Sequence, residues 1–211
     1  KPGNVIVGLA SYGQATYEDE YNSGISSNGL TSARHDLLSK YYAKKYPETF
    51  DDSVSSSLVY CGSKKITDEL EGTSLNIGKS LLSPTRTFTP VINKVLNEIP
   101  GKVNGIINCT GGAHTKVLHY IENLRIVKNN LLPVPPLFKL IQKESKTNWK
   151  EMFKVLNCGT RLEIYADEKY ASLIIDVAQS FGIAAQVIGY VEAKEKSEVV
   201  IKGEYGEYLY Q

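Results

Sequence analysis

The chain has 211 residues and nearly even charge, with 24 Lys and Arg against 23 Asp and Glu. This balance argues against nucleic acid as the main partner, which would call for a basic face. No apolar run approaches the 18 residues of a membrane-spanning helix, so we expect no membrane partner. The three cysteines lie far apart, which favours a reduced, cytoplasmic setting over a disulfide scaffold or a zinc site.

The first part of the chain is expected to begin with a strand and a helix separated by a long loop. Residues 4–10 are apolar and rich in β-branched side chains, which predicts a buried strand. Residues 11–29 are polar and rich in Gly, Ser and Tyr, and long loops of this kind are often functional. Apolar residues at helical spacing then predict a helix over 30–44. Residues 48–78 are weakly patterned, and we expect them to be irregular apart from a short strand at 57–62.

The middle of the chain alternates between helix and strand signals. A proline in its first turn and a Pro-Gly pair after its end bound a predicted helix over 88–98. A strand is predicted at 103–110, followed by a short helix or turn at 111–121 and a second strand at 125–130. A Pro-Pro pair then opens a predicted helix over 135–145.

The last part of the chain gives the clearest patterns. Asn148 with Glu151 three residues later predicts the capped start of a helix over 148–156. An alternating strand is predicted at 160–167, and a helix at 169–182 with Gly182 as its C-cap. Closing strands are expected at 184–193 and 197–210. Because strands and helices mix without a regular βαβ period, we predict one compact α+β domain, a sheet with helices packed on it.

Three stretches carry chemistry that suits an anionic ligand. In "SSNGL", Ser27 or Asn28 could cap the following helix and Gly29 lets the chain turn into it. The start of such a helix is an anion site, although ordinary capping explains the same residues. In "SPTR", the planar fork of Arg86 suits phosphate, although a surface arginine beside a turn is equally simple.

The third stretch is "INCTGG", in which Thr110, Gly111 and Gly112 stand between a strand and a helix start. Glycines expose backbone N–H groups and the threonine hydroxyl adds a donor, so the turn could cradle a phosphate. It matches neither GxGxxG nor a P-loop, and a purely structural turn is the alternative. The histidines lack metal-binding spacing and no catalytic nucleophile stands out, so we expect no metal site and name no catalytic residue.

The order of these stretches is more specific than any one of them. "SSNGL", "LLSPTRTF", "INCTGG", "LPVPPLFKLIQ" and "MFKVLNCGTRLEI" follow one another. The series resembles the carboxy-terminal half of the aminoimidazole ribonucleotide synthetase (phosphoribosylformylglycinamidine cyclo-ligase) family, with its S-N-G, P-T-R, H-x-T-G-G-G and F-N-x-G-x-G-M motifs. The resemblance runs from about residue 4 to residue 192. It departs from the family pattern at Asn108, Ala113, His114, Leu156, Arg161 and Leu162, and in two longer loops.

The resemblance implies a fold and a function. It implies a three-layer α/β/α domain with a mixed sheet, and an ATP-dependent ring closure of formylglycinamidine ribonucleotide in purine biosynthesis. ATP and Mg²⁺ would be held mainly by an N-terminal domain. The chain has no match to that domain and starts at Lys1 without a methionine, so we expect it to be a piece of a longer parent protein. The resemblance implies that the parent is a homodimer, and we expect this piece to be inactive on its own.

Within the resemblance, the substrate would meet Ser27, Asn28, Gly29, Arg86, Asn108, Thr110, Gly111 and Gly112. Two alternatives stay open. One is another member of the superfamily, close to formylglycinamidine ribonucleotide synthase or to a small-molecule kinase. The other is a non-catalytic ligand-binding module.

Overall fold

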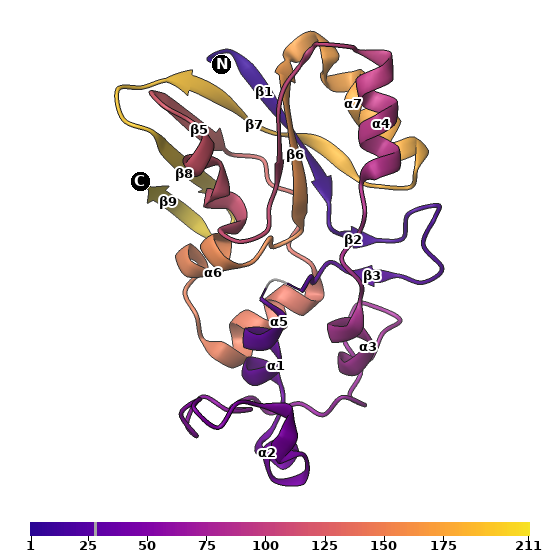
Figure 1. Cartoon of the computed structure of the whole chain (residues 1–211), viewed down its shortest axis with the longest axis vertical. Coiled ribbons are helices and arrows are strands. Elements are labelled where there is room, and N and C mark those ends of the chain that lie inside the picture. Colours follow the sequence, from indigo (N-terminus) through magenta and orange to yellow (C-terminus); the bar gives the residue numbers. More distant parts are fainter. Residues whose placement is uncertain (28) are drawn as a thin grey trace.

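The computed structural model describes residues 1–27 and 29–211, and its centre is a seven-stranded sheet (Figure 1). The order across the sheet is β4-β6-β1-β7-β5-β8-β9, and every described pair of neighbours is antiparallel except β5 with β8. The strands are β1 (Asn4–Ala10), β4 (Val103–Asn108), β5 (Leu124–Lys128), β6 (Thr160–Asp167), β7 (Ala185–Ala193), β8 (Glu198–Gly203) and β9 (Gly206–Tyr210).

Helices cover both faces of this sheet. One face carries α4 (Thr89–Glu98) and α7 (Ala171–Ser180), and the other carries the 3-10 helix η2 (Ala113–Tyr120) and α6 (Trp149–Val155). Alternate residues of β6 mark the two sides, because Leu162 and Ile164 join the core under α4 and α7, whereas Tyr165 joins the core under η2 and α6. The α+β class and the three-layer α/β/α arrangement are therefore confirmed.

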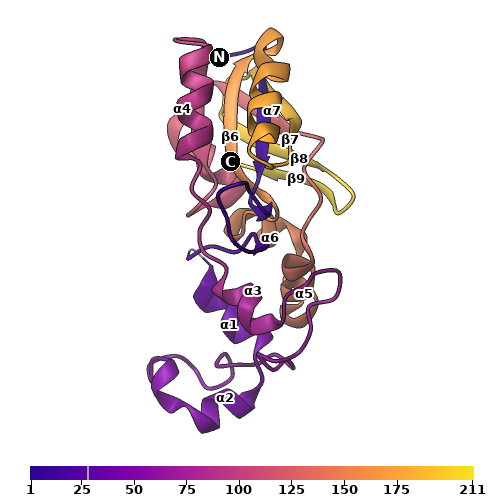
Figure 2. The same ribbon diagram turned by 90° about the vertical axis from the view of Figure 1, so that its right-hand side faces the viewer.

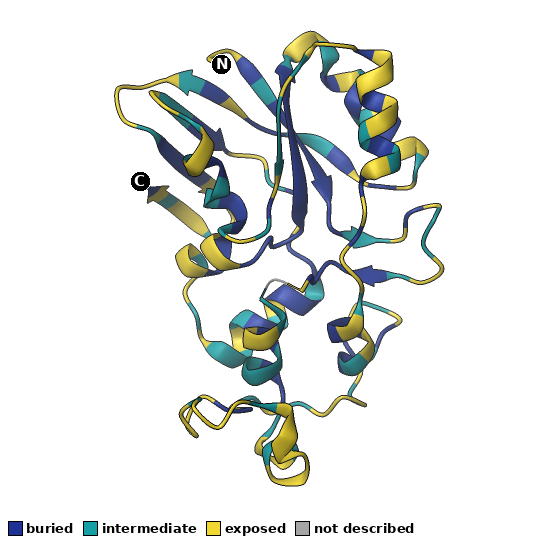
Figure 3. Cartoon of the chain, in the orientation of Figure 1, coloured by how far each residue is buried: buried dark blue, intermediate teal, exposed yellow. Residues whose placement is uncertain are grey.

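A second group of elements lies beyond one end of the sheet (Figures 1 and 2). It contains four α-helices, a two-stranded ribbon and a 3-10 turn: α1 (Leu30–Leu37), α2 (Lys40–Lys45), α3 (Ile77–Leu82), α5 (Pro136–Ser145), β2 (Tyr12–Gly13) with β3 (Asn22–Ser23), and η1 (Pro47–Thr49). The remaining short element, η3 (Glu168–Tyr170), precedes α7. Burial is densest in the strands and falls toward α2 (Figure 3).

The helix predicted over 30–44 is wrong in one respect, because the chain breaks it into α1 and α2. Leu38 is extended (φ −82°, ψ 146°) and bridges to Lys64, and the Ser39 N–H donates to the Lys64 carbonyl at 3.0 Å. The returning chain comes so close at Gly62 that a Cβ there would lie 2.2 Å from the Leu37 carbonyl oxygen. A contact from a distant segment thus overrides local helix propensity.

The strand predicted at 57–62 is also wrong. These residues form turns, and the Cys61 N–H donates to the carbonyl of His35 at 2.8 Å instead of joining a sheet. Other boundaries agree closely, and the capped start at Asn148 is confirmed, because its side chain accepts from the Glu151 N–H at 2.9 Å. Gly182 (φ 73°) lies one residue beyond the C-cap of α7, which is Phe181.

Candidate functional site

The Thr110-Gly111-Gly112 turn leaves edge strand β4 and enters η2. Its backbone is left-handed at three successive residues, Gly111 (φ 55°), Gly112 (φ 93°) and Ala113 (φ 40°), and only glycine takes such angles without strain. The Thr110 N–H donates to the Asn108 carbonyl at 2.7 Å. The N–H groups of Gly111 and Gly112 donate to no acceptor in the described part of the chain, so both are available to a ligand.

Asn157 ties this turn to the segment that precedes α1. Its side-chain amide donates to the Gly24 carbonyl at 2.9 Å, and its own carbonyl accepts from His114 Nε2 at 3.0 Å. Because a carbonyl can only accept, Nε2 carries the proton of that imidazole. The Asn157 carboxamide oxygen also accepts from the Gly159 N–H at 2.9 Å. The structure therefore brings together three stretches that the sequence keeps far apart.

The start of α1 lies beside the same junction. Gly29 is the N-cap (φ 85°) and no described side chain caps the helix, so the expectation that Ser27 caps it is wrong. The Ser27 N–H instead donates to Thr85 Oγ1 at 3.3 Å, which links this segment to the "SPTR" stretch. A Cβ at Gly29 would lie 2.5 Å from Leu156 Cδ2, so close packing explains the glycine. Asn28 lies outside the described residues.

Arg86 is not a surface arginine. Its side chain is 1% exposed, and all five guanidinium N–H groups have acceptors: both carboxylate oxygens of Glu18 and the carbonyls of Ala10, Tyr12 and Gly13. Burial alone would raise the pKa of Glu18, but the hydrogen bonds from Arg86 and from the Ala15 N–H lower it below its usual range. In this conformation no N–H of Arg86 is left for a phosphate, so its direct contact with one is not supported.

A buried ion pair holds the first residues of η2, which directly follow the turn. Lys128 and Glu163 are both fully buried and hydrogen-bond to each other, and Lys128 Nζ also donates to the His114 carbonyl at 2.8 Å. Tyr165 donates to the second carboxylate oxygen at 2.6 Å. Burial would raise the pKa of Glu163, but the charge and the hydrogen bond of Lys128 hold it well below its usual range. Burial lowers the pKa of His114, so this imidazole is neutral.

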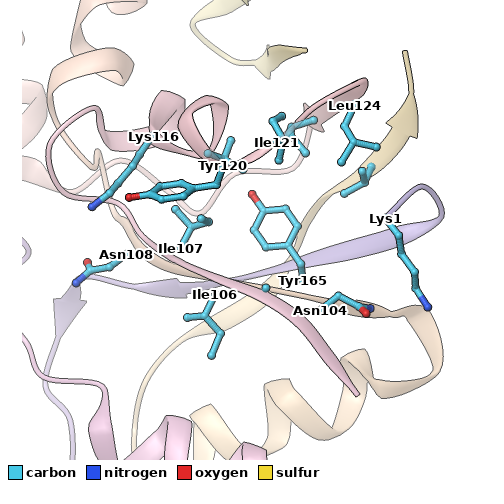
Figure 4. Close-up of a pocket in the computed structure, with 14 residues that line it drawn as sticks. Lys1, Asn104, Ile106, Ile107, Asn108, Lys116, Tyr120, Ile121, Leu124 and Tyr165 are labelled. Atoms are coloured by element: carbon cyan, nitrogen blue, oxygen red, sulfur yellow. The ribbon is translucent and has the colours of Figure 1, made fainter. Parts of the chain in front are cut away.

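A pocket of about 540 Å³ opens beside the turn on the same face of the sheet. Asn108 and Lys116 lie at one end, Lys1 and Asn104 lie at the other, and Tyr120 and Tyr165 line the stretch between them (Figure 4). Its volume is within the range of small-molecule sites. Asn108 both ends β4 and lines the pocket, so the pocket reaches to within two residues of the glycine turn along the chain.

Sequence reasoning named the turn but missed the side chains beneath it. Asn157, Lys128 and Glu163 were not proposed as site residues, and Arg161 was noted only as a departure from a family motif. One signal was present, because Arg161 and Glu163 alternate with apolar residues within a single strand. Both are buried, at 3% and 0% exposure. No group of three or more His, Cys, Asp or Glu that could hold a metal ion occurs among the described residues.

The fold and the turn define a class: an α/β/α domain with a mixed sheet whose edge strand β4 ends in an exposed glycine turn. The family described as AIR synthase related protein, C-terminal domain, matches residues 1–202. The chain belongs to this family, which confirms the resemblance seen in the sequence.

Individual relatives agree with this assignment. The chain is 32% identical over 206 residues to the phosphoribosylformylglycinamidine cyclo-ligase of Methanococcus vannielii, covering 97% of this chain and 48% of that protein. It is 28% identical over 207 residues to the enzyme of the same name from Caldicellulosiruptor saccharolyticus, covering 94% and 54%. The chain therefore spans about half the length of these relatives.

A solved structure shares the fold. The hydrogenase maturation protein HypE superposes with a TM-score of 0.51 at 15% identity, covering 100% of this chain and 53% of that one. Among the described residues, no helix is both long and apolar enough to span a membrane.

Proposed function

We propose that this chain is the substrate-binding half of an ATP-dependent phosphoribosylformylglycinamidine cyclo-ligase, which closes the imidazole ring of formylglycinamidine ribonucleotide in purine biosynthesis. The observation that carries the proposal is the turn at Thr110–Gly112, in which Gly111 is exposed and the N–H groups of both glycines donate to no described residue. It stands in a chain matched by this family over nearly its whole length. Relatives bearing that name match the chain at about 30% identity.

In this proposal the chain positions an anionic substrate and stabilises its charge. The Gly111 and Gly112 N–H groups and the Thr110 hydroxyl point donors at the ligand, as backbone nests do for phosphate. Preorganised donors need no rearrangement when charge develops, which is how such sites lower a barrier. Asn108 and the pocket beyond it would hold the rest of the ribonucleotide.

ATP and Mg²⁺ belong to the other half of the parent protein in this proposal. The described residues of this chain offer no group of three or more His, Cys, Asp or Glu for a metal ion, and we assign no step to Mg²⁺ or ATP here. The parent would then be a two-domain enzyme and a homodimer, and this chain alone would show no ATP-dependent turnover.

Arg86 takes a positioning role in the proposal. By binding three carbonyls of residues 10–13 and the carboxylate of Glu18, it fixes the long first loop against the end of β1. The neighbouring Thr85 hydroxyl accepts from the Ser27 N–H. The "SPTR" stretch would thus hold the segment that carries Ser27 and Gly29 beside the turn.

The test is calorimetric titration of this chain with formylglycinamidine ribonucleotide. Wild type is compared with Gly111→Val, which forbids the left-handed turn, and with Gly101→Val, a matched left-handed glycine (φ 70°) that has no neighbouring atom within 4 Å of a built Cβ. We expect heat from wild type and Gly101→Val and none from Gly111→Val. Equal heat from all three proteins would show that the turn does not contribute to binding.

A second experiment mixes this chain with the N-terminal half of a related cyclo-ligase and measures ATP-dependent turnover of formylglycinamidine ribonucleotide. Turnover by the joined halves and none by this chain alone would support the division of labour. Turnover by the chain alone would contradict it. If wild type binds other phosphate esters but not formylglycinamidine ribonucleotide, another member of the superfamily becomes the better assignment.

A further inference from the structure

Arg161 is the buried charge on this face of the sheet that lacks a partner. The other charged side chains buried in the described part of the chain are ion-paired: Lys128 with Glu163, Arg86 with Glu18, and Glu198 with Arg125. Arg161 is 3% exposed, forms no ion pair with a described residue, and its Nε is fully buried without an acceptor. The charged residues buried under η2 therefore carry a net charge of +1.

The two buried arginines of this chain make a contrast. All five N–H groups of Arg86 have acceptors within the chain, whereas no hydrogen bond from the Arg161 guanidinium reaches an acceptor among the described residues. Burying an unpaired charge is costly, and proteins keep one only where something else compensates it. Burial lowers the pKa of Arg161. No carboxylate of the described chain offsets the charge.

The position of Arg161 points to what compensates it. The Cys109 N–H donates to the Arg161 carbonyl at 2.7 Å, so Arg161 lies directly beside the strand end from which the glycine turn departs. Arg161 lies at a β-bulge, where β1 pairs Leu9 with Leu162 and Ala10 with Thr160. The charges of both Glu163 and Arg161 act on the pKa of the buried Cys109 thiol, which directly precedes the turn, so Arg161 lies near the buried Lys128–Glu163 pair. The unpaired cation and the free N–H groups of Gly111 and Gly112 thus belong to one corner of the molecule.

We infer that Arg161 is an anion-binding residue, which together with the Thr110–Gly112 turn takes a phosphate or other oxyanion group of the ligand. The inference rests on the proposed function for the role of the turn, and goes beyond it by adding a cation where the resembling family has a glycine. A guanidinium supplies paired donors to two oxygens of a phosphate, and a phosphate supplies the charge that the buried arginine lacks.

The test compares two arginine-to-methionine variants of this chain by thermal unfolding and by titration with inorganic phosphate and ribose 5-phosphate. Without ligand, Arg161→Met should unfold at the same temperature as wild type or higher, because the variant removes an uncompensated buried charge. Arg86→Met should unfold at a clearly lower temperature, because it leaves Glu18 and three carbonyls without donors. Lys102→Met, at an exposed site, controls for the loss of one positive charge.

With ligand, wild type and Lys102→Met should be stabilised by either phosphate compound in a saturable way. Arg161→Met should bind about tenfold more weakly or worse, as expected for losing hydrogen bonds between charged groups. If Arg161→Met destabilises the protein as much as Arg86→Met does, the arginine is structural and the inference fails. The inference also fails if wild type shows no stabilisation by phosphate.

One further arm separates this inference from the proposed function. Phosphate binding that is lost in Gly111→Val but kept in Arg161→Met would leave the turn in place and overturn the role of Arg161. Phosphate binding that needs Arg161, without any binding of formylglycinamidine ribonucleotide, would support the anion site and overturn the proposed substrate.

Discussion

Replacing Lys128 by methionine is expected to destabilise the protein strongly, because it leaves the Glu163 carboxylate buried without its cation. Both side chains are fully buried, and Lys128 also holds the His114 carbonyl. Removing one member of a buried pair costs about 3–5 kcal/mol. The pKa of Glu163, about 2 against an ordinary 4.5, agrees in sign, because the folded chain favours the charged carboxylate. For a chain of this length, that range predicts a fall in melting temperature of about 6–20 °C.

The assay is thermal and urea unfolding at neutral pH, with two companions. Lys128→Met with Glu163→Leu removes both charges and should recover most of the loss, since a hydrophobic replacement of a buried pair is often neutral. Lys202→Met breaks an ion pair with Glu207 in which Nζ and Oε1 lie 2.9 Å apart and the two side chains are 48% and 63% exposed. This change should alter stability by less than about 1 kcal/mol. A Lys128→Met protein that melts within about 2 °C of wild type would refute the reasoning.

The same pair predicts how stability depends on acid. The pKa of Glu163 is lower in the folded chain than its ordinary value of 4.5, so the unfolded chain takes up this proton first. The stabilisation is therefore complete above about pH 4.5 and is lost as the pH falls toward 2. Urea unfolding across this window should show a smaller acid loss in the doubly substituted protein than in wild type.

Three further changes have defined outcomes. In wild type, stability should fall below pH 6.5 by up to about 1.4 kcal/mol per pH unit, because the buried His114 imidazole stays neutral while the unfolded one takes up a proton. His114→Phe should flatten this fall. A wild-type profile already flat from pH 6.5 to 5 would contradict the prediction. Gly29→Ala should cost about 1–3 kcal/mol through its positive φ and the contact with Leu156, and in a double-mutant cycle Leu156→Ala should relieve the steric part. Asn148→Ala should cost about 1 kcal/mol in urea unfolding, whereas Ser39→Ala, at an N-cap whose side chain makes no capping bond, should change little.

Much of the fold could be predicted because local patterns decide it. Residues 4–10 form a continuous apolar run rich in β-branched side chains, residues 160–167 alternate on a strand period, and α7 shows its apolar stripe at helical spacing. Burial of these side chains therefore settles the elements. The break between α1 and α2 could not be predicted in this way. It depends on Lys64 pairing with Leu38, and a contact between segments so far apart leaves no local signal.

The site residues also differ in whether the sequence alone could predict their roles. The glycine turn could be predicted, because two glycines after a strand permit the left-handed backbone of a tight turn, which other residues adopt only with strain. The role of Arg86 could not, since its acceptors come from residues 10–18, and only the fold gathers them around a guanidinium. The alternating "TRLE" within β6 predicts a strand with one polar face. That this polar face is buried depends on η2 lying over it.

The place of β1 in the sheet sets the order in which the chain can fold. β1 is the first strand of this sheet along the chain, yet both of its neighbours, β6 and β7, come from beyond residue 159. The Lys128 ammonium group likewise becomes buried only after Glu163 has been synthesised and can pair with it. Pairings between segments so distant in sequence form slowly and expose apolar strands meanwhile. A nascent chain halted before residue 190 would leave β1 without its complete set of partners, so the central sheet can assemble only after β7 has been synthesised.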